Sequence, residues 1–162
     1  MGLFDKFKKK DTSIKLVAPM DGEVIDVTEV ADPVFAQKMV GDGVAIKPTS
    51  GTVVAPCDGV IKLLFPTGHA MGIEVDGVEL LLHLGMDTVE LKGEGFTTYI
   101  KQGDTVVAGQ KIIDMDLDLI QEKGYLTVSP LIITNGDVVA TMDKHLGQVE
   151  AGKDIVLTIE KK

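Results

Sequence analysis

Residues 17–25 read Val17-Ala18-Pro19-Met20-Asp21-Gly22-Glu23-Val24-Ile25, and the pattern returns as Val54-Ala55-Pro56-Cys57-Asp58-Gly59-Val60-Ile61. In each copy the proline presets φ and the glycine tolerates a positive φ, so the motif predicts a tight turn. From residue 14 onward, short runs of Val, Ile and Leu are broken by Gly, Asp and Pro about every 8–12 residues, which is typical of an all-β sandwich or barrel. The repeat therefore predicts two related β units packed into one barrel-like domain.

The composition supports a single globular domain with few helices. Of the 162 residues, 44% are hydrophobic, 4% are aromatic and 18 are glycine, which favours tight turns between short aliphatic strands. We expect residues 14–162 to form this domain and residues 1–13 to form a flexible or amphipathic tail that makes weak contact with a membrane surface. Short helices are predicted over 32–38, which opens with an Asp-Pro pair, and over 116–123, which precedes a glycine.

The charge balance limits the partners. The chain has 16 Lys and Arg against 25 Asp and Glu, a net charge of −9, which argues against nucleic-acid binding and favours a basic partner protein. The single cysteine, Cys57, cannot form an intrachain disulfide. No apolar run approaches the roughly 18 residues of a membrane span, and residues 1–10 lack the apolar segment of a signal peptide, so we expect a cytoplasmic protein.

Three histidines are the main candidates for chemistry, because the sequence has no Walker loop, no nucleophile elbow and no Cys-x-x-Cys. His145 has no supporting motif and is expected on the surface. His69 and His83 flank a predicted hairpin of residues 70–74 and 78–82. Whether the two imidazoles meet depends on the register of this hairpin.

Two registers are compatible with the hairpin sequence. A two-residue turn pairs Val75 with Val78 and places His69 opposite Leu84, with the two imidazoles on opposite faces. A three-residue turn with a left-handed glycine pairs residue 74 with Val78 and places His69 directly opposite His83. The second register keeps the other face of the hairpin almost wholly apolar. We therefore predict the register that pairs the histidines.

Facing imidazoles suit phosphoryl transfer, because neutral imidazole offers a nucleophilic nitrogen near pH 7. One ring takes the phosphoryl group while the other donates a hydrogen bond to its oxygens. Thr67, two residues before His69, is placed to fix the tautomer of His69 through its hydroxyl. The alternative is a pair of half-exposed histidines without a chemical role.

Residues 83–96, His83-Leu84-Gly85-Met86-Asp87-Thr88-Val89-Glu90-Leu91-Lys92-Gly93-Glu94-Gly95-Phe96, resemble the signature around the phosphorylated histidine of the glucose-type enzyme IIA family of the bacterial sugar phosphotransferase system. Further likeness extends through residues 34–48, 54–56 and 67–70. This resemblance implies a β-sandwich, of the barrel-sandwich hybrid kind, with duplicated swapped hairpins and a few short helical turns. It also implies a phosphotransferase in which His83 accepts the phosphoryl group, His69 stabilises it and Thr67 orients His69.

The resemblance further implies the partners. The phosphocarrier HPr would donate the phosphoryl group, and the cysteine of a IIB permease domain would receive it. Asp32 and Asp87 match acidic positions of the family that meet a basic face of HPr. The positions of the family's apolar docking rim are occupied by Val34, Phe35, Val40, Phe65, Met71 and Val89. Enteric relatives also bind permeases and other regulated targets such as kinases when they are unphosphorylated, which suggests a further, regulatory role.

A zinc-binding regulatory or hydrolase-like β domain is the competing hypothesis, because zinc peptidases of the lysostaphin type share this kind of scaffold. His69 and His83 would be its ligands. Two imidazoles leave a tetrahedral zinc short of a third protein ligand, so zinc would need a carboxylate from a bound partner. Phosphoryl transfer through histidine requires no cofactor.

Overall fold

The computed structural model describes residues 13–162. The predicted N-terminal tail lies outside these residues except for residue 13, and the assignment of residues 14–162 to one domain stays a prediction. The described strands and helical segments, in chain order, are β1 (Ile14–Val17), β2 (Gly22–Asp26), η1 (Val27–Glu29), α2 (Pro33–Ala36), β3 (Asp42–Pro48), β4 (Thr52–Val54), β5 (Gly59–Leu64), β6 (Ala70–Val75), β7 (Val78–His83), η2 (Thr88–Leu91), β8 (Phe96–Thr98), β9 (Thr105–Val106), β10 (Lys111–Met115), α3 (Leu117–Glu122), β11 (Ser129–Ile133), η3 (Gly136–Val138), β12 (Val139–Lys144), β13 (Gly147–Val149) and β14 (Ile155–Lys161).

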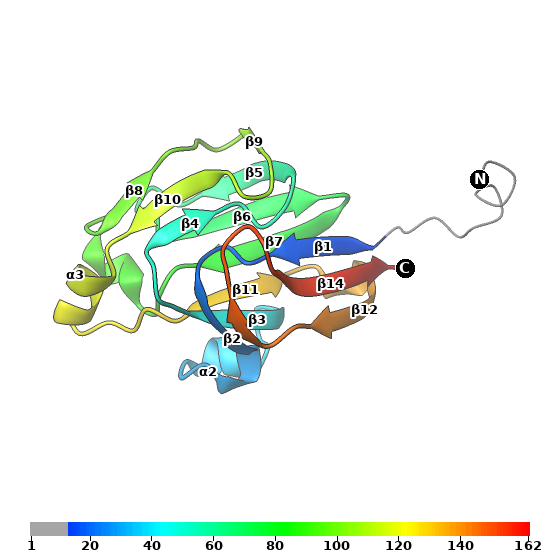
Figure 1. Ribbon diagram of the computed structural model, residues 1–162, viewed down its shortest axis with the longest axis horizontal. Coiled ribbons are helices and arrows are strands. Elements are labelled where there is room, and N and C mark those ends of the chain that lie inside the picture. Colours follow the sequence, from blue (N-terminus) through cyan, green and yellow to red (C-terminus); the bar gives the residue numbers. More distant parts are fainter. Residues whose placement is uncertain (1–12) are drawn as a thin grey trace, which may run out of the picture.

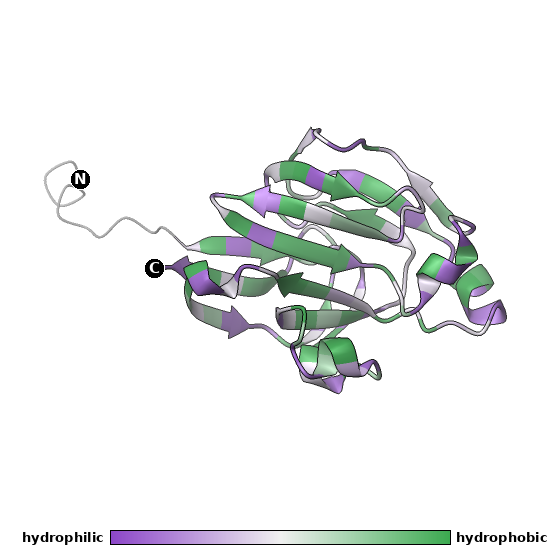
Figure 2. Cartoon of the chain, turned by 180° about the vertical axis from the view of Figure 1, so that it is seen from behind, coloured by the Kyte–Doolittle hydropathy of each residue, from purple (hydrophilic) through white to green (hydrophobic). Residues whose placement is uncertain are grey.

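The predicted all-β class is confirmed. An eight-stranded sheet has the order β13-β2-β3-β11-β7-β6-β5-β9, and two three-stranded sheets have the orders β1-β14-β12 and β4-β10-β8 (Figure 1). The main core joins all three sheets, with Leu16 of β1, Leu82 of β7 and Ile113 of β10 completely buried. Figure 2 shows the strands mainly green, interrupted by single purple residues, as expected for sheets with one buried face.

The repeated motif forms a pair of reciprocal backbone hydrogen bonds at the centre of the molecule. The Val17 N–H donates to the Pro56 carbonyl at 2.8 Å, and the equivalent Val54 N–H donates to the Pro19 carbonyl at 2.7 Å. Each repeat therefore binds the other through the same atoms. The expected duplication is thus present as a pseudo-twofold relation between the two β units.

The same relation extends to two loops late in the chain. The Asp21 carboxylate accepts from the Ala151 N–H at 2.7 Å, and the equivalent Asp58 carboxylate accepts from the Ala108 N–H at 2.8 Å. The glycines after these alanines meet, because a Cβ on Gly152 would lie 3.3 Å from the Cα of its counterpart. Each early hairpin is thus completed by a late segment, as expected for swapped hairpins.

Both predicted helices are present, although they are shorter than expected. The Asp32 carboxylate caps α2 by accepting from the Val34 N–H at 2.8 Å, and Asp116 caps α3 in the same way through Leu119. Helix α2 belongs to the connection between β2 and β3, which folds over the outer face of the large sheet and buries Phe35 against a second, smaller hydrophobic cluster.

The predicted hairpin register is wrong. β6 and β7 pair Val75 with Val78, so the turn has two residues, Asp76 and Gly77, with φ of 48° and 82°. This is a type I′ geometry, which matches the strand twist and which Asp tolerates. Asn135 also holds this turn by donating to the Gly77 carbonyl at 2.9 Å. That contact comes from a segment distant in the sequence, so local pattern could not reveal it.

The two ends of the described chain lie together. β1 and β14 pair antiparallel, with Ile14 opposite Ile159 (Figure 1). The turn between β6 and β7 lies at the same end, because the Lys161 ammonium donates to the Asp76 carbonyl. The far ends of β6 and β7, which carry the two histidines, are therefore one strand length away from the ends of the chain.

Candidate functional site

The imidazoles of His69 and His83 lie against each other despite the different register. Their ring centroids are 5.3 Å apart and the rings are inclined by 80°. His69 precedes the first residue of β6 and follows Gly68, whose φ is 74°, so its side chain is not bound to the alternation of a regular strand. The predicted meeting of the two rings is present, but the strand end produces it rather than direct cross-strand pairing.

The tautomer of His83 is set by the chain that follows it. Its Nδ1 lies 2.8 Å from the Gly85 carbonyl, and because a carbonyl only accepts, Nδ1 carries the proton and Nε2 keeps its lone pair. Gly85 has φ of 77°, and a Cβ there would lie 2.6 Å from the Thr88 side chain and 2.8 Å from the Leu126 carbonyl. Only glycine fits this turn, which holds the accepting carbonyl in place.

His69 is buried and neutral. Only 3% of its surface is exposed, and burial, followed by the neighbouring charge of His83, lowers its pKa to about 4. Its Nδ1 is hydrogen bonded to the Thr67 hydroxyl, which can donate as well as accept. When the hydroxyl donates, the proton of His69 resides on Nε2, where it is available as a hydrogen-bond donor.

His83 is half-buried and lies in an acidic setting. Burial lowers its pKa, while the Gly85 carbonyl and the charges of Asp32 and Asp87 act in the opposite direction. Asp32 is held at the start of α2 by its cap, and Asp87 precedes η2 with a left-handed φ of 59°. These two carboxylates favour any positive charge that develops on the His83 ring.

Apolar side chains border the two imidazoles. The Phe35 and His83 ring centroids are 5.2 Å apart, and the Phe65 and His69 centroids are also 5.2 Å apart. The residues of the expected docking rim differ in exposure: Val34, Phe65 and Val89 are 43%, 37% and 48% exposed, Val40 is partly buried, and Phe35 is 7% exposed. Three apolar side chains therefore offer substantial contact surface around the histidines.

Met71 does not belong to this rim. Its side chain has no exposed surface and lies in the main core, opposite Leu82 in the hairpin. The observed register turns this position inward, so the expectation that Met71 contacts a partner is wrong.

Comparison with known proteins relates this geometry to a family. Residues 14–139 match the family model of the phosphoenolpyruvate-dependent sugar phosphotransferase system, EIIA 1. The glucose-specific EIIA component of Haemophilus influenzae is 43% identical, with the match covering 99% of this chain and 100% of that protein. The solved glucose permease IIA from Mycoplasma capricolum has a TM-score of 0.84 and 40% identity over 94% of this chain and 97% of that one.

The chain belongs to the EIIA 1 family. It is a phosphocarrier of the sugar phosphotransferase system, a phosphotransferase that passes phosphoryl groups between proteins and works with HPr and IIB domains. In the glucose-specific EIICBA component of Staphylococcus carnosus, the match covers 86% of this chain at 48% identity but only 21% of that longer protein. The EIIA unit thus occurs both alone and within a larger chain.

The geometry of this EIIA protein does not support zinc as a resident metal. Within residues 13–162, no group of three or more His, Cys, Asp or Glu side chains is arranged to hold a metal ion. The two imidazoles are the only ligands that the zinc hypothesis had named, and two are too few for a closed or catalytic site. None of the helices over the same residues is long and apolar enough to cross a membrane.

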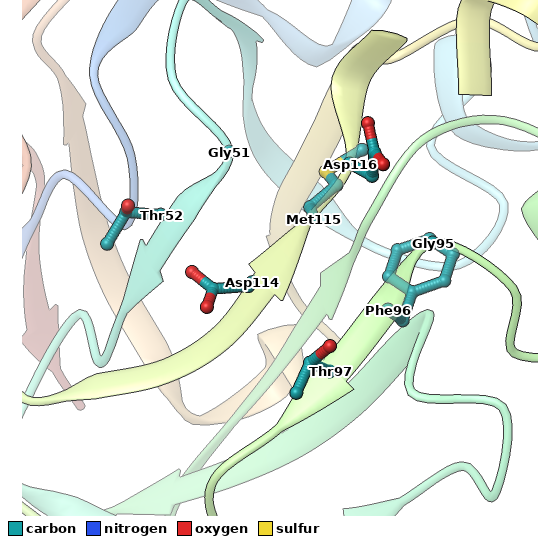
Figure 3. A pocket seen from close by; sticks show the side chains of 8 residues that line it. All are labelled: Gly51, Thr52, Gly95, Phe96, Thr97, Asp114, Met115 and Asp116. Atoms are coloured by element: carbon teal, nitrogen blue, oxygen red, sulfur yellow. The ribbon is translucent and has the colours of Figure 1, made fainter. Parts of the chain in front are cut away.

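A further hollow of the EIIA protein has neither His69 nor His83 in its lining. It has a volume of about 560 Å³ and is lined by residues of β4, β8 and β10, including Thr52, Thr97 and Asp114 (Figure 3). The Asp114 carboxylate already accepts from Tyr99 at 2.5 Å and pairs with Lys111 at 2.9 Å, and Asp116 caps α3. Its charged groups are therefore engaged within the protein.

Sequence reasoning missed two contributors to the site. Gly85 supplies the carbonyl that orients His83, although the glycine two residues after the histidine was part of the family-like motif. Leu126 lies beside the same turn, because its carbonyl accepts from the Met86 N–H at 3.0 Å. No motif marks Leu126, and only the long-range packing of the segment before β11 reveals it.

Proposed function

We propose that Nε2 of His83 accepts the phosphoryl group of phospho-HPr and passes it to the cysteine thiolate of a IIB permease domain. The P–N bond of the donor phosphohistidine breaks as a P–N bond forms on His83. The P–N bond on His83 breaks in turn as a P–S bond forms on the cysteine. The hydrogen bond from Nδ1 to Gly85 carries this proposal, because it leaves Nε2 unprotonated and nucleophilic.

The surroundings of His83 favour the phosphorylated ring. Attack through Nε2 while Nδ1 keeps its proton leaves the imidazole ring positively charged. The Gly85 carbonyl and the carboxylates of Asp32 and Asp87 offset that charge. The transfer therefore needs no proton to leave His83, and it needs no resident metal or cofactor.

His69 acts on the phosphoryl oxygens in this proposal. The Thr67 hydroxyl donates to Nδ1 of His69, so Nε2 carries the proton and donates to the phosphoryl group during transfer. Because the pKa of His69 is about 4, the ring stays neutral at cytoplasmic pH, where we place the reaction. The name of the Haemophilus influenzae relative, a glucose-specific EIIA component, supports a permease of the glucose type as the final acceptor.

The test is reconstitution with phosphoenolpyruvate, enzyme I and HPr. We expect acid-labile, base-stable phosphate on the wild-type protein and none on His83→Ala. His145→Ala is the matched control, because His145 is exposed and bonds Thr158 at 3.1 Å, away from the site. Acid-labile phosphate that persists in His83→Ala, or that is missing from both the wild type and the control, would contradict the proposal.

A further inference from the structure

Two neighbouring hollows share the lining residues Ala31 and Leu126, and the nearer one is lined by the acidic residues that act on His83. The first, of about 220 Å³, is lined by Asp32, Asp87 and Met86, with Ala31, Pro33 and Leu126. The second, of about 330 Å³, lies beyond it, and Ala31 and Leu126 line both. We call this the Leu126 groove. It leads from the acidic residues that act on His83 to a part of the surface to which the proposed mechanism gives no role.

The far part of the groove has an apolar lining. Ile25, Val30 and Val128 contribute side chains to it, with Glu29 and Lys47 among the polar residues. Val30 and Val128 belong to the second hydrophobic cluster, or pack against it, so the floor is supported by folded structure. A hollow of this size accommodates one large apolar side chain.

Leu126 lines both hollows and is held firmly by backbone contacts. Its side chain is 52% exposed, while its carbonyl accepts from the Met86 N–H at 3.0 Å and lies close against Gly85. The same turn orients His83. An exposed leucine fixed to the turn of the phosphoacceptor is placed to contact any protein that reaches His83.

We propose that the Leu126 groove is an additional docking subsite for the phosphoryl-transfer partners. A protein docked on His83 inserts an apolar side chain beyond Leu126 and places an adjacent Lys or Arg near Asp32 and Asp87. This subsite rests on the proposed function, on the residues Ala31 and Leu126 that both hollows share, and on Asp32 and Asp87, which line the near hollow and act on His83. Acidic residues at the entrance select a cationic neighbour, and the apolar far end selects the inserted side chain.

The test compares two exposed leucines. Leu126→Ser removes the apolar side chain that lines both hollows. Leu146→Ser is the matched control, because Leu146 is 55% exposed and lies outside the groove lining. Ala31→Leu fills the groove from its edge and provides a second variant. For each protein we would measure kcat and KM for phosphoryl transfer from phospho-HPr and to a IIB domain, with thermal unfolding as the check on folding.

We expect Leu126→Ser and Ala31→Leu to raise KM roughly tenfold for at least one of the two partners, with kcat nearly unchanged, because burial of an aliphatic side chain is lost in binding. Leu146→Ser should keep the wild-type KM. The subsite is rejected if both groove variants keep KM within about twofold of wild type for both partners. That result leaves phosphate on His83, whereas failure of the proposed function removes it, so the two failures are distinguishable.

Discussion

In the first half of the large sheet, residues 27–41 connect β2 to β3, whereas in the second half residues 65–69 connect the equivalent strands β5 and β6. The long connection contains α2 and supplies Asp32, Val34 and Phe35 to the site. The short connection supplies Thr67 and His69. The duplicated framework thus presents an apolar surface from one half and, from the other, the histidine that donates a hydrogen bond in the proposed mechanism.

The two connections differ in how their side chains are held. Phe35 packs into a separate hydrophobic cluster outside the large sheet. The long connection is therefore held in place by its own buried contacts. His69 depends on the end of β6, on Gly68 and on the Thr67 hydroxyl. We infer that changes in the long connection alter partner binding, and that changes in the short connection alter the rate of transfer.

The largest expected effect tests this division directly. His69→Ala should still become phosphorylated on His83, but its transfer to a IIB domain should slow roughly 10²–10³-fold, because a donor to the transferring group is lost. Val34→Ala, at an exposed apolar residue of the long connection, should instead raise KM with little change in kcat. Quenched-flow transfer measurements give both constants. A slower kcat in Val34→Ala than in His69→Ala would contradict the division.

The second expected effect is a dependence of stability on pH that belongs to the short connection. The pKa of His69 is about 4 in the folded protein against 6.5 in the unfolded chain. Between these values the unfolded chain binds a proton that the folded protein does not, so the free energy of unfolding falls as pH drops from 6.5 to 4. The loss is on the order of 3 kcal/mol.

Urea unfolding at several pH values measures this loss. His69→Gln is the comparison variant, because it cannot titrate and cancels the contribution of the carboxylates when the two curves are subtracted. We expect the free energy of unfolding of the wild type, minus that of the variant, to fall steadily toward pH 4. Parallel curves across this range would show that His69 titrates normally in the folded state.

The smallest expected effect tests the pseudo-twofold relation through two equivalent glycines. Gly109 and Gly152 occupy equivalent positions with φ of 86° and 74°. A Cβ on Gly152 would lie 3.3 Å from the other glycine, whereas a Cβ on Gly109 meets nothing within 4 Å. Both alanine variants should lose about 1–2 kcal/mol from the left-handed backbone, and Gly152→Ala should lose slightly more. Thermal unfolding compares them, and equal stability of both variants and wild type would exclude this strain.

Much of the fold followed from local chemistry in the sequence. The Asp-Pro start of α2 acts through residues that are neighbours in the chain, so its structure could be predicted. The glycines of the repeat do not form the predicted tight turns, because Gly22 and Gly59 are the first residues of the extended strands β2 and β5. The register of β6 and β7 could not, because Asn135 and Lys161 hold the turn from distant segments. Met71 was placed on the docking rim by the family resemblance, whereas its side chain is fully buried opposite Leu82.

The candidate site was predictable in its residues but not in its geometry. The family-like motif pointed to His69, His83 and Thr67, and the bond between Thr67 and His69 is present. The two-residue turn was rejected because it would place His83 on the apolar face of the hairpin. In the folded protein the face of His83 is covered by Phe35 from α2, a long-range contact that no hairpin pattern contains.

The pairing of the first and last strands has a consequence for how this EIIA unit can be tethered. β1 starts and β14 ends on the side of the β6–β7 turn, and β7, with its six residues, spans roughly 17–20 Å from there to His83. A linker attached at either end therefore departs from the face opposite the histidines. The same fold can serve as a free carrier or as a module on a flexible linker, with the end that holds His69 and His83 unobstructed in both arrangements.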